Sequence, residues 1–199
     1  GGITISHLRM GNKPIKATYY VENPSMVVCT KESYLQKMKM LDKIKKNGIF
    51  LLNTNKNKDE ILKEMTSHDK KILQSRNIKF YIVNAGRIAA DNGLSTKMAE
   101  DAGIPGKISA IMETLIFKLG KIMDFDFTVQ KIKESLAVKF ANKSGGIVEK
   151  NIKAIDCSIN SLVQVKLPVV DYVEELQKKK DMFELISSME GDLLPVSSF

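Results

Sequence analysis

The sequence is poor in cysteine, aromatic residues and long apolar runs. Its two cysteines, Cys29 and Cys157, lie far apart, and neither belongs to a Cys-x-x-Cys pair. This spacing argues against a disulfide framework and against an iron–sulfur, structural zinc or other metal site in the chain. Two ordinary thiols fit a reducing compartment, so we expect a cytoplasmic location, with an organellar one left open.

Apolar runs stay far below the roughly 18 residues that a membrane-spanning helix needs. No secretory signal pattern opens the chain, although a leader removed from its start is left open. Aromatic residues make up 7% of the sequence, and no aromatic RNA-binding motif or zinc-finger spacing accompanies them. We therefore expect neither a membrane span nor nucleic-acid binding.

A net charge of +8 comes from 31 Lys and Arg residues against 23 Asp and Glu residues. This excess favours acidic partners such as nucleotides or another polyanion. The lysines are scattered among acids and polar residues, which is typical of a solvated surface. The solvated surface is the favoured interpretation.

Short apolar runs alternate with segments of helical periodicity. Strands are expected at 15–21, 26–29, 49–52 and 79–83, where β-branched, aromatic and other apolar residues lie between turn-forming residues. A strand–helix–strand order indicates a βαβ unit with a right-handed crossover and parallel strand pairing. The predicted fold class is α/β, a mostly parallel, Rossmann-like sheet between helical layers, followed by a helical C-terminal part.

Apolar residues at helical spacing predict the helices. One is expected from Tyr34 to Ile44, capped by Thr30 and ended by Asn47-Gly48. One or two short helices are expected within 55–77 and another after Asn84, followed by longer helices near 108–123, 127–140 and 148–159. Pro105 suits the start of the first long helix, and Ser144-Gly145-Gly146 is interpreted as a turn. We expect an α/β core at 1–166 and, at 167–199, a charged linker or docking segment.

The opening stretch, GGITISHLRMGNKPI, concentrates groups that suit an active-site edge. Ile3 and Ile5 alternate with Thr4 and Ser6, as in a short strand that buries one face. A guanidinium such as that of Arg9 matches a carboxylate or a phosphate. The alternative interpretation is a loop in which His7 and Arg9 only hold the chain to itself. The candidate residues here are Gly2, Thr4, Ser6, His7, Arg9 and Gly11.

Polar residues also follow the predicted buried strands. Cys29-Thr30, Asn53-Thr54 and Asn84 come directly after such runs. In open α/β sheets, ligands bind outside the carboxyl ends of the strands. Asn53 and Thr54 are therefore candidate ligand-proximal residues, and the alternative is that these positions only cap helices and turn the chain.

Several blocks resemble, in order, the gamma domain of the pyruvate:ferredoxin (flavodoxin) oxidoreductases, a family of two-oxoacid oxidoreductases. GGITISHLRMG (1–11), SYLQKMKMLDKIKKNGIFLLNT (33–54), KFYIVNAGRIAADNGL (79–94) and GKISAIMETLIFKLGKIM (106–123) are similar to that domain. GDLLPVSSF (191–199) resembles the junction to the next domain of the single-chain enzymes. The glycine-rich first strand–loop–helix unit of the family domain is absent, so the resemblance implies a core that lacks its first βα unit.

Enzymes of this family oxidatively decarboxylate a two-oxoacid on thiamine diphosphate, transfer the acyl group to coenzyme A and pass electrons through iron–sulfur clusters to ferredoxin or flavodoxin. The resemblance implies that thiamine diphosphate, Mg²⁺ and the clusters belong to other domains or subunits. This segment would be a non-catalytic neighbour of the active site that helps coenzyme A binding and domain docking. No cofactor is expected on the segment alone, and the isolated chain is expected to be inactive.

Two other interpretations stay open at this stage. The chain could be a standalone α/β module that binds a nucleotide or coenzyme A without redox chemistry, or a purely structural spacer. The resemblance also leaves open the two-oxoacid, the electron acceptor (ferredoxin, flavodoxin or a fused reductase) and the oligomeric state.

Overall fold

The computed structural model describes residues 3–11, 13–16, 19–95, 107–141 and 146–167. The chain divides into two compact units, 1–166 and 167–199. All described helices and strands belong to the first unit. The proposed linker (168–199), the proposed start of the first long helix (Pro105) and Ser144-Gly145 lie outside the described residues.

A four-stranded sheet forms the centre of the first unit. Its strands are β1 (Met26–Cys29), β2 (Ile49–Asn53), β3 (Lys79–Val83) and β4 (Val163–Val165), in the spatial order β1-β2-β3-β4. β1 and β3 both pair with β2 in parallel, and β4 pairs with β3 antiparallel. The prediction of a mostly parallel sheet is confirmed.

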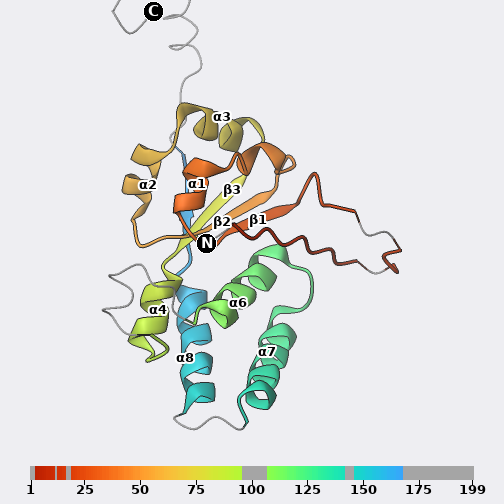
Figure 1. Ribbon diagram of the computed structural model, residues 1–199, viewed down its shortest axis with the longest axis vertical. Coiled ribbons are helices and arrows are strands. Elements are labelled where there is room, and N and C mark those ends of the chain that lie inside the picture. Colours follow the sequence, from red (N-terminus) through yellow and green to blue (C-terminus); the bar gives the residue numbers. More distant parts are fainter. Residues whose placement is uncertain (1–2, 12, 17–18, 96–106, 142–145, 168–199) are drawn as a thin grey trace, which may run out of the picture. The chain divides into compact units, whose positions relative to one another are not determined.

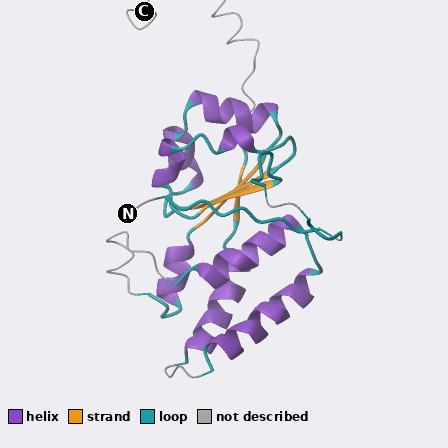
Figure 2. Ribbon diagram, turned by 45° about the vertical axis from the view of Figure 1, so that its right-hand side comes forward, coloured by secondary structure: helices purple, strands orange, loops and turns teal. Residues whose placement is uncertain are grey.

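Helices cover both faces of this sheet. α1 (Ser33–Lys37), α2 (Lys58–Glu64), α3 (Ser67–Ser75) and the short 3₁₀ helix η1 (Leu41–Lys43) lie on one side. α4 (Ala85–Asp91), α6 (Ser109–Gly120) and α8 (Ile147–Asn160) lie on the other (Figure 1). The turned view in Figure 2 shows the same two groups of helices on opposite sides of the strands. The three-layer α/β class is thus confirmed.

Alternation along the strands sends side chains to both layers. Phe50 and Phe80 are register partners in β2 and β3, and their rings stack with centroids 5.2 Å apart. Both are fully buried, because side chains two residues apart share a face and a parallel sheet is covered on both faces. The neighbouring positions Leu51 and Val83 project to the opposite face, toward α4, α6 and α8.

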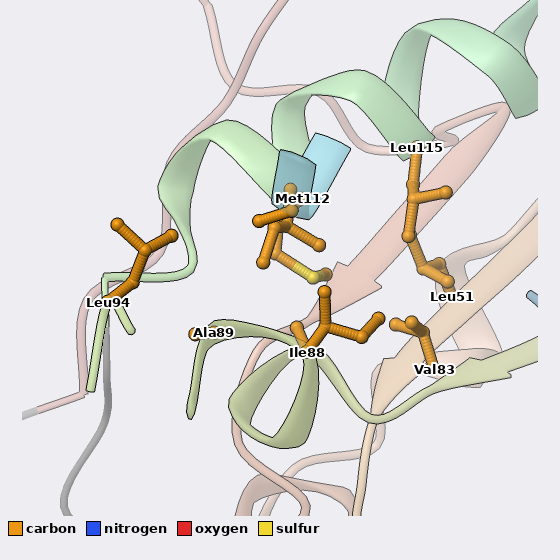
Figure 3. Close-up of a cluster of buried hydrophobic side chains, with 10 residues drawn as sticks. Leu51, Val83, Ile88, Ala89, Leu94, Met112 and Leu115 are labelled. Atoms are coloured by element: carbon orange, nitrogen blue, oxygen red, sulfur yellow. The ribbon is translucent and has the colours of Figure 1, made fainter. Parts of the chain in front are cut away.

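The main core lies between the sheet and those three helices. In Figure 3, Leu51 and Val83 of the sheet converge with Ile88 of α4 and with Met112 and Leu115 of α6. Each of these five side chains is buried. Burying a side chain of this kind contributes about 1.5–3 kcal/mol. The helix starting at Ala85 is therefore fixed directly beyond the end of β3.

A second apolar cluster joins the last three described helices. α7 (Phe125–Lys139) packs against α6 and α8 through Ile132 and Leu136, which meet Ala110 and Ile155. The predicted helices near 108–123, 127–140 and 148–159 are confirmed, with ends shifted by one to three residues. Shifts of this size are normal, because the last turn of a helix frays easily.

Two sequence predictions on this unit are wrong. The apolar positions from Tyr34 to Ile44 form the short α1 and η1 with an extended Met38 between them, instead of one helix. Thr30 is not the cap of α1, since the N-cap position belongs to Glu32. The break lets Leu41 and Ile44 reach full burial, which outweighs the helical periodicity.

The predicted strands at the start of the chain are also absent. Residues 3–6, and 15–16 and 19–21 of the predicted strand at 15–21, carry no strand assignment. The described contacts of this segment run through the side chains of His7 and Arg9 rather than through a backbone ladder. Alternation of apolar and polar residues is not sufficient for a strand, because a strand needs a partner for its backbone groups.

A tight turn leads from η1 into β2. Asn47 adopts a left-handed backbone conformation with φ of 60°, and the next residue, Gly48, lies against the chain. A Cβ atom at Gly48 would come within 2.4 Å of the Ile44 side chain and 2.8 Å of the Lys45 carbonyl oxygen. The Asn-Gly pair that was predicted to end a helix therefore turns the chain into the central strand.

Candidate functional site

Asn53 ties together the ends of two parallel strands. Its side-chain amide donates to the Thr30 carbonyl oxygen beyond β1 at 3.0 Å. Its side-chain oxygen accepts from the backbone N–H of Ala85 beyond β3 at 2.9 Å. Asn84, the third predicted strand-end residue, caps α4 by accepting from the Arg87 N–H at 2.8 Å. The carboxyl edge of the sheet is thus stabilised by its own polar side chains.

Thr54, which follows Asn53, is buried and joins a second polar cluster. Its hydroxyl pairs with the Glu32 carboxylate and accepts from the backbone N–H of Lys56 at 3.0 Å. The hydroxyl therefore connects the loop after β1 with the loop after β2. Asn53 and Thr54 thus both lie where β2 ends, with their polar side-chain atoms bonded within the chain.

Lys56 links the two loops to α2 electrostatically. Its Nζ lies 2.5 Å from a carboxylate oxygen of Glu32 and 2.5 Å from one of Glu64. Hydrogen bonds to these two carboxylates raise the pKa of Lys56 to about 12, because both favour the ammonium form. Lys56 therefore stays positively charged at neutral and moderately alkaline pH.

Glu32, Lys56 and Glu64 form part of one wall of a cleft of about 720 Å³. A volume of this size is in the range of small-molecule sites. Apolar side chains of the lining come from α1, α2 and the segments after them, namely Leu35, Met38, Ile61 and Met65. Because Glu32 and Lys56 each lie three residues beyond a parallel strand, the cleft is at the carboxyl end of the sheet, where ligands of open α/β folds bind.

Some charged side chains around the cleft form ion pairs and others do not. Lys56 is held by Glu32 and Glu64, and His68 lies 3.0 Å from Asp42. Lys37 and Lys39 also line the cleft and are exposed. Neither of these two lysines forms an ion pair with another described residue. They are the ammonium groups of the cleft that an incoming anion can reach without breaking an ion pair.

The opening stretch is held to the segment 19–21. Arg9 donates to the carbonyl oxygens of Tyr19 and Tyr20 at 2.7 and 2.9 Å, and its guanidinium carbon lies 3.5 Å from the centroid of the Tyr19 ring. The backbone N–H of Val21 donates to Nδ1 of His7 at 3.1 Å. The side chains of His7 and Arg9 are thus both hydrogen-bonded to residues 19–21.

The other predicted residues of this stretch are more open. Thr4, Ser6 and Gly11 are exposed, and a Cβ at Gly11 would meet nothing within 4 Å. Gly2 lies outside the described residues. Among the described residues, no hydrogen bond joins the opening stretch to Asn53 or Thr54. The two groups of candidate residues are therefore not linked directly.

The strand-end cluster includes charged residues that the sequence analysis did not single out. Glu32, Lys56 and Glu64 hold the cleft wall together. Lys56 and Glu64 lie within 55–77, where only short helices were predicted, and Glu32 lies before the helix predicted from Tyr34. A usable signal was their position, since Glu32 and Lys56 each come three residues after a buried strand. Lys37 and Lys39 were missed because they lie within what was predicted to be a continuous helix.

Cys29 is the remaining strand-end residue, and its thiol is buried. Its Sγ contacts the Lys31 carbonyl oxygen at 3.1 Å. Burial is the main influence on the Cys29 thiol and raises its pKa. The hydrogen bond to the Lys31 carbonyl lowers the pKa, and the nearby Glu32 charge raises it further, so the net change is upward. The thiol is therefore in its neutral, unreactive form at neutral pH.

In the described parts of the chain, no three His, Cys, Asp or Glu side chains are grouped closely enough to hold a metal ion. Nor does any described helix have the length and apolarity to cross a membrane.

Comparison with known proteins assigns the chain to a family. The family model described as pyruvate ferredoxin/flavodoxin oxidoreductase matches residues 1–161. The chain belongs to this family. The match includes both the opening stretch and the strand-end cleft, so these features lie within the family's shared sequence.

Curated relatives of this family align with the whole chain. The pyruvate:ferredoxin oxidoreductase of Moorella thermoacetica is 30% identical over 209 residues, and the pyruvate-flavodoxin oxidoreductase of Enterobacter agglomerans is 33% identical over 208 residues. Each alignment covers 100% of this chain and 17% of the relative. The chain therefore spans about a sixth of the length of these relatives.

A solved structure supports the fold. The pyruvate oxidoreductase subunit PORC of Thermotoga maritima is similar with a TM-score of 0.50 at 21% identity, over 73% of this chain and 67% of that one. At this identity the likeness concerns the fold alone.

Proposed function

We propose that this chain is the gamma-type module of a pyruvate:ferredoxin or pyruvate:flavodoxin oxidoreductase. In that enzyme the module helps to bind coenzyme A and to dock neighbouring modules, and carries out no catalytic step itself. The observation that carries the proposal is the family match over residues 1–161, together with whole-chain alignment to oxidoreductases about six times as long. The complete enzyme would convert pyruvate to acetyl-CoA and pass the electrons to ferredoxin or flavodoxin.

The redox and thiamine chemistry of such an enzyme is assigned to its other modules. A four-iron or two-iron cluster needs four thiolate or similar ligands. This chain has two cysteines, of which Cys29 is buried against its own backbone and Cys157 is exposed on α8. These donors do not fit a cluster, which supports assigning the clusters to other modules. Thiamine diphosphate and Mg²⁺ are assigned to other modules following the family resemblance.

The strand-end cleft suits part of a coenzyme A molecule. The ligand's phosphates are anionic, and Lys37 and Lys39 line the cleft without ion-pair partners among the described residues. The apolar wall that includes Met38 and Ile61 matches an adenine ring or a pantetheine chain. Asn53 and Thr54 act here as positioning residues, because their polar atoms hold the two loops that shape the cleft.

The residues of the opening stretch belong to the same proposal. Gly2, Thr4, Ser6, His7, Arg9 and Gly11 are assigned to the mouth of the active site, following the family resemblance. His7 and Arg9 serve as positioning residues, because their contacts with residues 19–21 set the course of this stretch.

Charge reversal at the cleft tests the coenzyme A assignment. In the full-length oxidoreductase, we expect the double change Lys37→Glu and Lys39→Glu to raise KM for coenzyme A about tenfold, since each exposed charge contact contributes up to about 1 kcal/mol. The KM for pyruvate should stay unchanged. The matched control is the double change Lys70→Glu and Lys71→Glu on α3, at two lysines that do not line the cleft.

Two outcomes would contradict the assignment. One is an unchanged KM for coenzyme A in the cleft variant. The other is an equal rise in the control, which would indicate a general effect of net charge on an anionic substrate rather than a site.

A further inference from the structure

Large apolar side chains are concentrated on the opening arm, defined as residues 3–11, 13–16 and 19–22. Among the described residues, seven of the twelve exposed large hydrophobic side chains belong to this arm. Leu8 is 67% exposed and Tyr20 is 78% exposed. The full set on the arm is Ile3, Ile5, Leu8, Met10, Ile15, Tyr19 and Tyr20. Scattered single exposures are normal on a protein surface, but a concentration of this kind marks an interaction site.

The arm is organised by contacts of its own. Arg9 joins its two halves through two hydrogen bonds and a stacked tyrosine, and His7 adds a third hydrogen bond and packs its ring 5.1 Å from that of Tyr20. The side chains of His7 and Arg9 are therefore used within the arm, while its aliphatic side chains face solvent. A surface ordered before binding loses less conformational entropy when a partner docks.

The family comparison indicates what covers this surface. The match begins at residue 1, so the arm is shared family sequence and not an appended tail. Relatives that align with the whole chain have more than four-fifths of their length outside the aligned part. An apolar arm that belongs to the shared sequence has its most direct partner in that remaining part.

The charges of the arm restrict the chemistry of the partner. Its described residues carry Arg9, Lys13 and Lys16 against the single acid Glu22. Both lysines are exposed. Exposed apolar side chains combined with an excess of positive charge match an apolar surface that also carries carboxylates.

We infer that the opening arm is an inter-module docking strap, which packs onto an apolar, carboxylate-bearing surface of another module of the same oxidoreductase. The inference rests on the proposed function, because it takes the partner from the remainder of that enzyme. Ile5 and Leu8 supply the apolar contact, and Arg9 keeps the strap in shape. A second copy of this chain is the competing occupant.

Photo-cross-linking in the purified full-length oxidoreductase tests the strap. The photoreactive residue p-benzoylphenylalanine replaces Leu8 in one preparation and Val138, which is 81% exposed on α7, in the control. We expect the substitution at Leu8 to cross-link to a peptide outside residues 1–199, in a segment that carries Asp or Glu. Cross-links to the same arm of a second copy, cross-links within this chain only, or no cross-link from Leu8 would each overturn the inference.

A charged variant gives a second, independent measurement. In the full-length enzyme, we expect Leu8→Glu to accelerate amide hydrogen exchange of residues 3–11 at least tenfold, while Val138→Glu leaves the arm unchanged. Equal exchange in wild type and Leu8→Glu would overturn the strap. The cross-linking experiment does not depend on whether the full-length enzyme with Leu8→Glu assembles.

The same preparation separates this inference from the proposed function. If the wild-type protein does not couple pyruvate oxidation to reduction of a ferredoxin-type acceptor, the proposed function fails. If that activity is present but Leu8 forms no cross-link outside the chain, only the strap fails.

Discussion

Removing the Asn53 side chain should loosen the carboxyl edge of the sheet. This residue is the only described side chain that bonds to both the Thr30 carbonyl beyond β1 and the Ala85 N–H beyond β3. Ala85 is fully buried, so its N–H has no access to water once the Asn53 oxygen is gone. Asn53→Ala should therefore destabilise the fold more than the loss of an exposed hydrogen bond would.

The magnitude follows from the two bonds. The bond to Thr30 is partly exposed and contributes about 0.5–1.5 kcal/mol, and the unsatisfied buried N–H of Ala85 costs about 1–3 kcal/mol. The expected loss for Asn53→Ala is about 2–4 kcal/mol. Asn53→Asp keeps the acceptor for Ala85 but places a carboxylate oxygen against the Thr30 carbonyl oxygen, so we expect a loss of about 1–3 kcal/mol from the missing donor and the repulsion between the two oxygens.

Urea denaturation of the purified chain, followed by circular dichroism, measures both variants. Asn160→Ala at the exposed end of α8 is the control and should stay within about 0.5 kcal/mol of wild type. A loss below about 1 kcal/mol for Asn53→Ala would refute the argument.

Three further predictions concern other parts of the chain. Gly48→Ala should lower stability by about 1–3 kcal/mol in the same assay, because its Cβ would lie 2.4 Å from a side-chain methyl group and 2.8 Å from a backbone carbonyl oxygen; Gly11→Ala, with open space around it, should be neutral. Ellman's reagent at pH 8 should modify Cys157 about 100-fold faster than Cys29, whose buried thiol has a raised pKa, and equal rates would contradict the burial. Wild type should have a higher thermal midpoint than Lys56→Met, and this difference should be constant up to about pH 10.5. It should decline as the pH rises through about 12, because folding raises the pKa of Lys56 from 10.5 to about 12. A difference that does not depend on pH would refute the ionic contribution.

The central strands could be predicted from the sequence because they are continuous apolar runs between turn residues. Segments 26–29, 49–52 and 79–83 were located to within one residue, since burial on both faces demands an unbroken apolar run. β4 was missed. It has three residues, lies at the sheet edge and exposes Val163, so its sequence carries no comparable pattern.

Tertiary packing decided the elements that the sequence pattern misjudged. The periodicity from Tyr34 to Ile44 is genuinely helical, yet η1 separates from α1 so that Leu41 can be buried. The alternation of Ile3 and Ile5 with polar residues likewise produced no strand, because no described strand pairs with that segment. Local sequence does not contain information about the availability of a partner.

The carboxyl ends of the strands could be located from the sequence, whereas the contacts made there could not. The rule that ligands bind beyond parallel strands led to Asn53 and Thr54. Both bond to the loop after β1, but neither is among the residues that line the cleft. That their polar atoms are engaged within the chain depends on the precise spacing of the loops. The arrangement of Lys56 between two carboxylates could not be predicted either, because these residues come from three separate segments.

Amide hydrogen exchange of the full-length oxidoreductase, with and without saturating coenzyme A, tests the central claim most directly. The account predicts that coenzyme A slows exchange in residues 30–39 and 54–66, which surround the cleft, and leaves α7 at 125–139 unchanged. Slower exchange confined to regions outside residues 1–199, or to α7, would contradict the claim that this module binds the substrate.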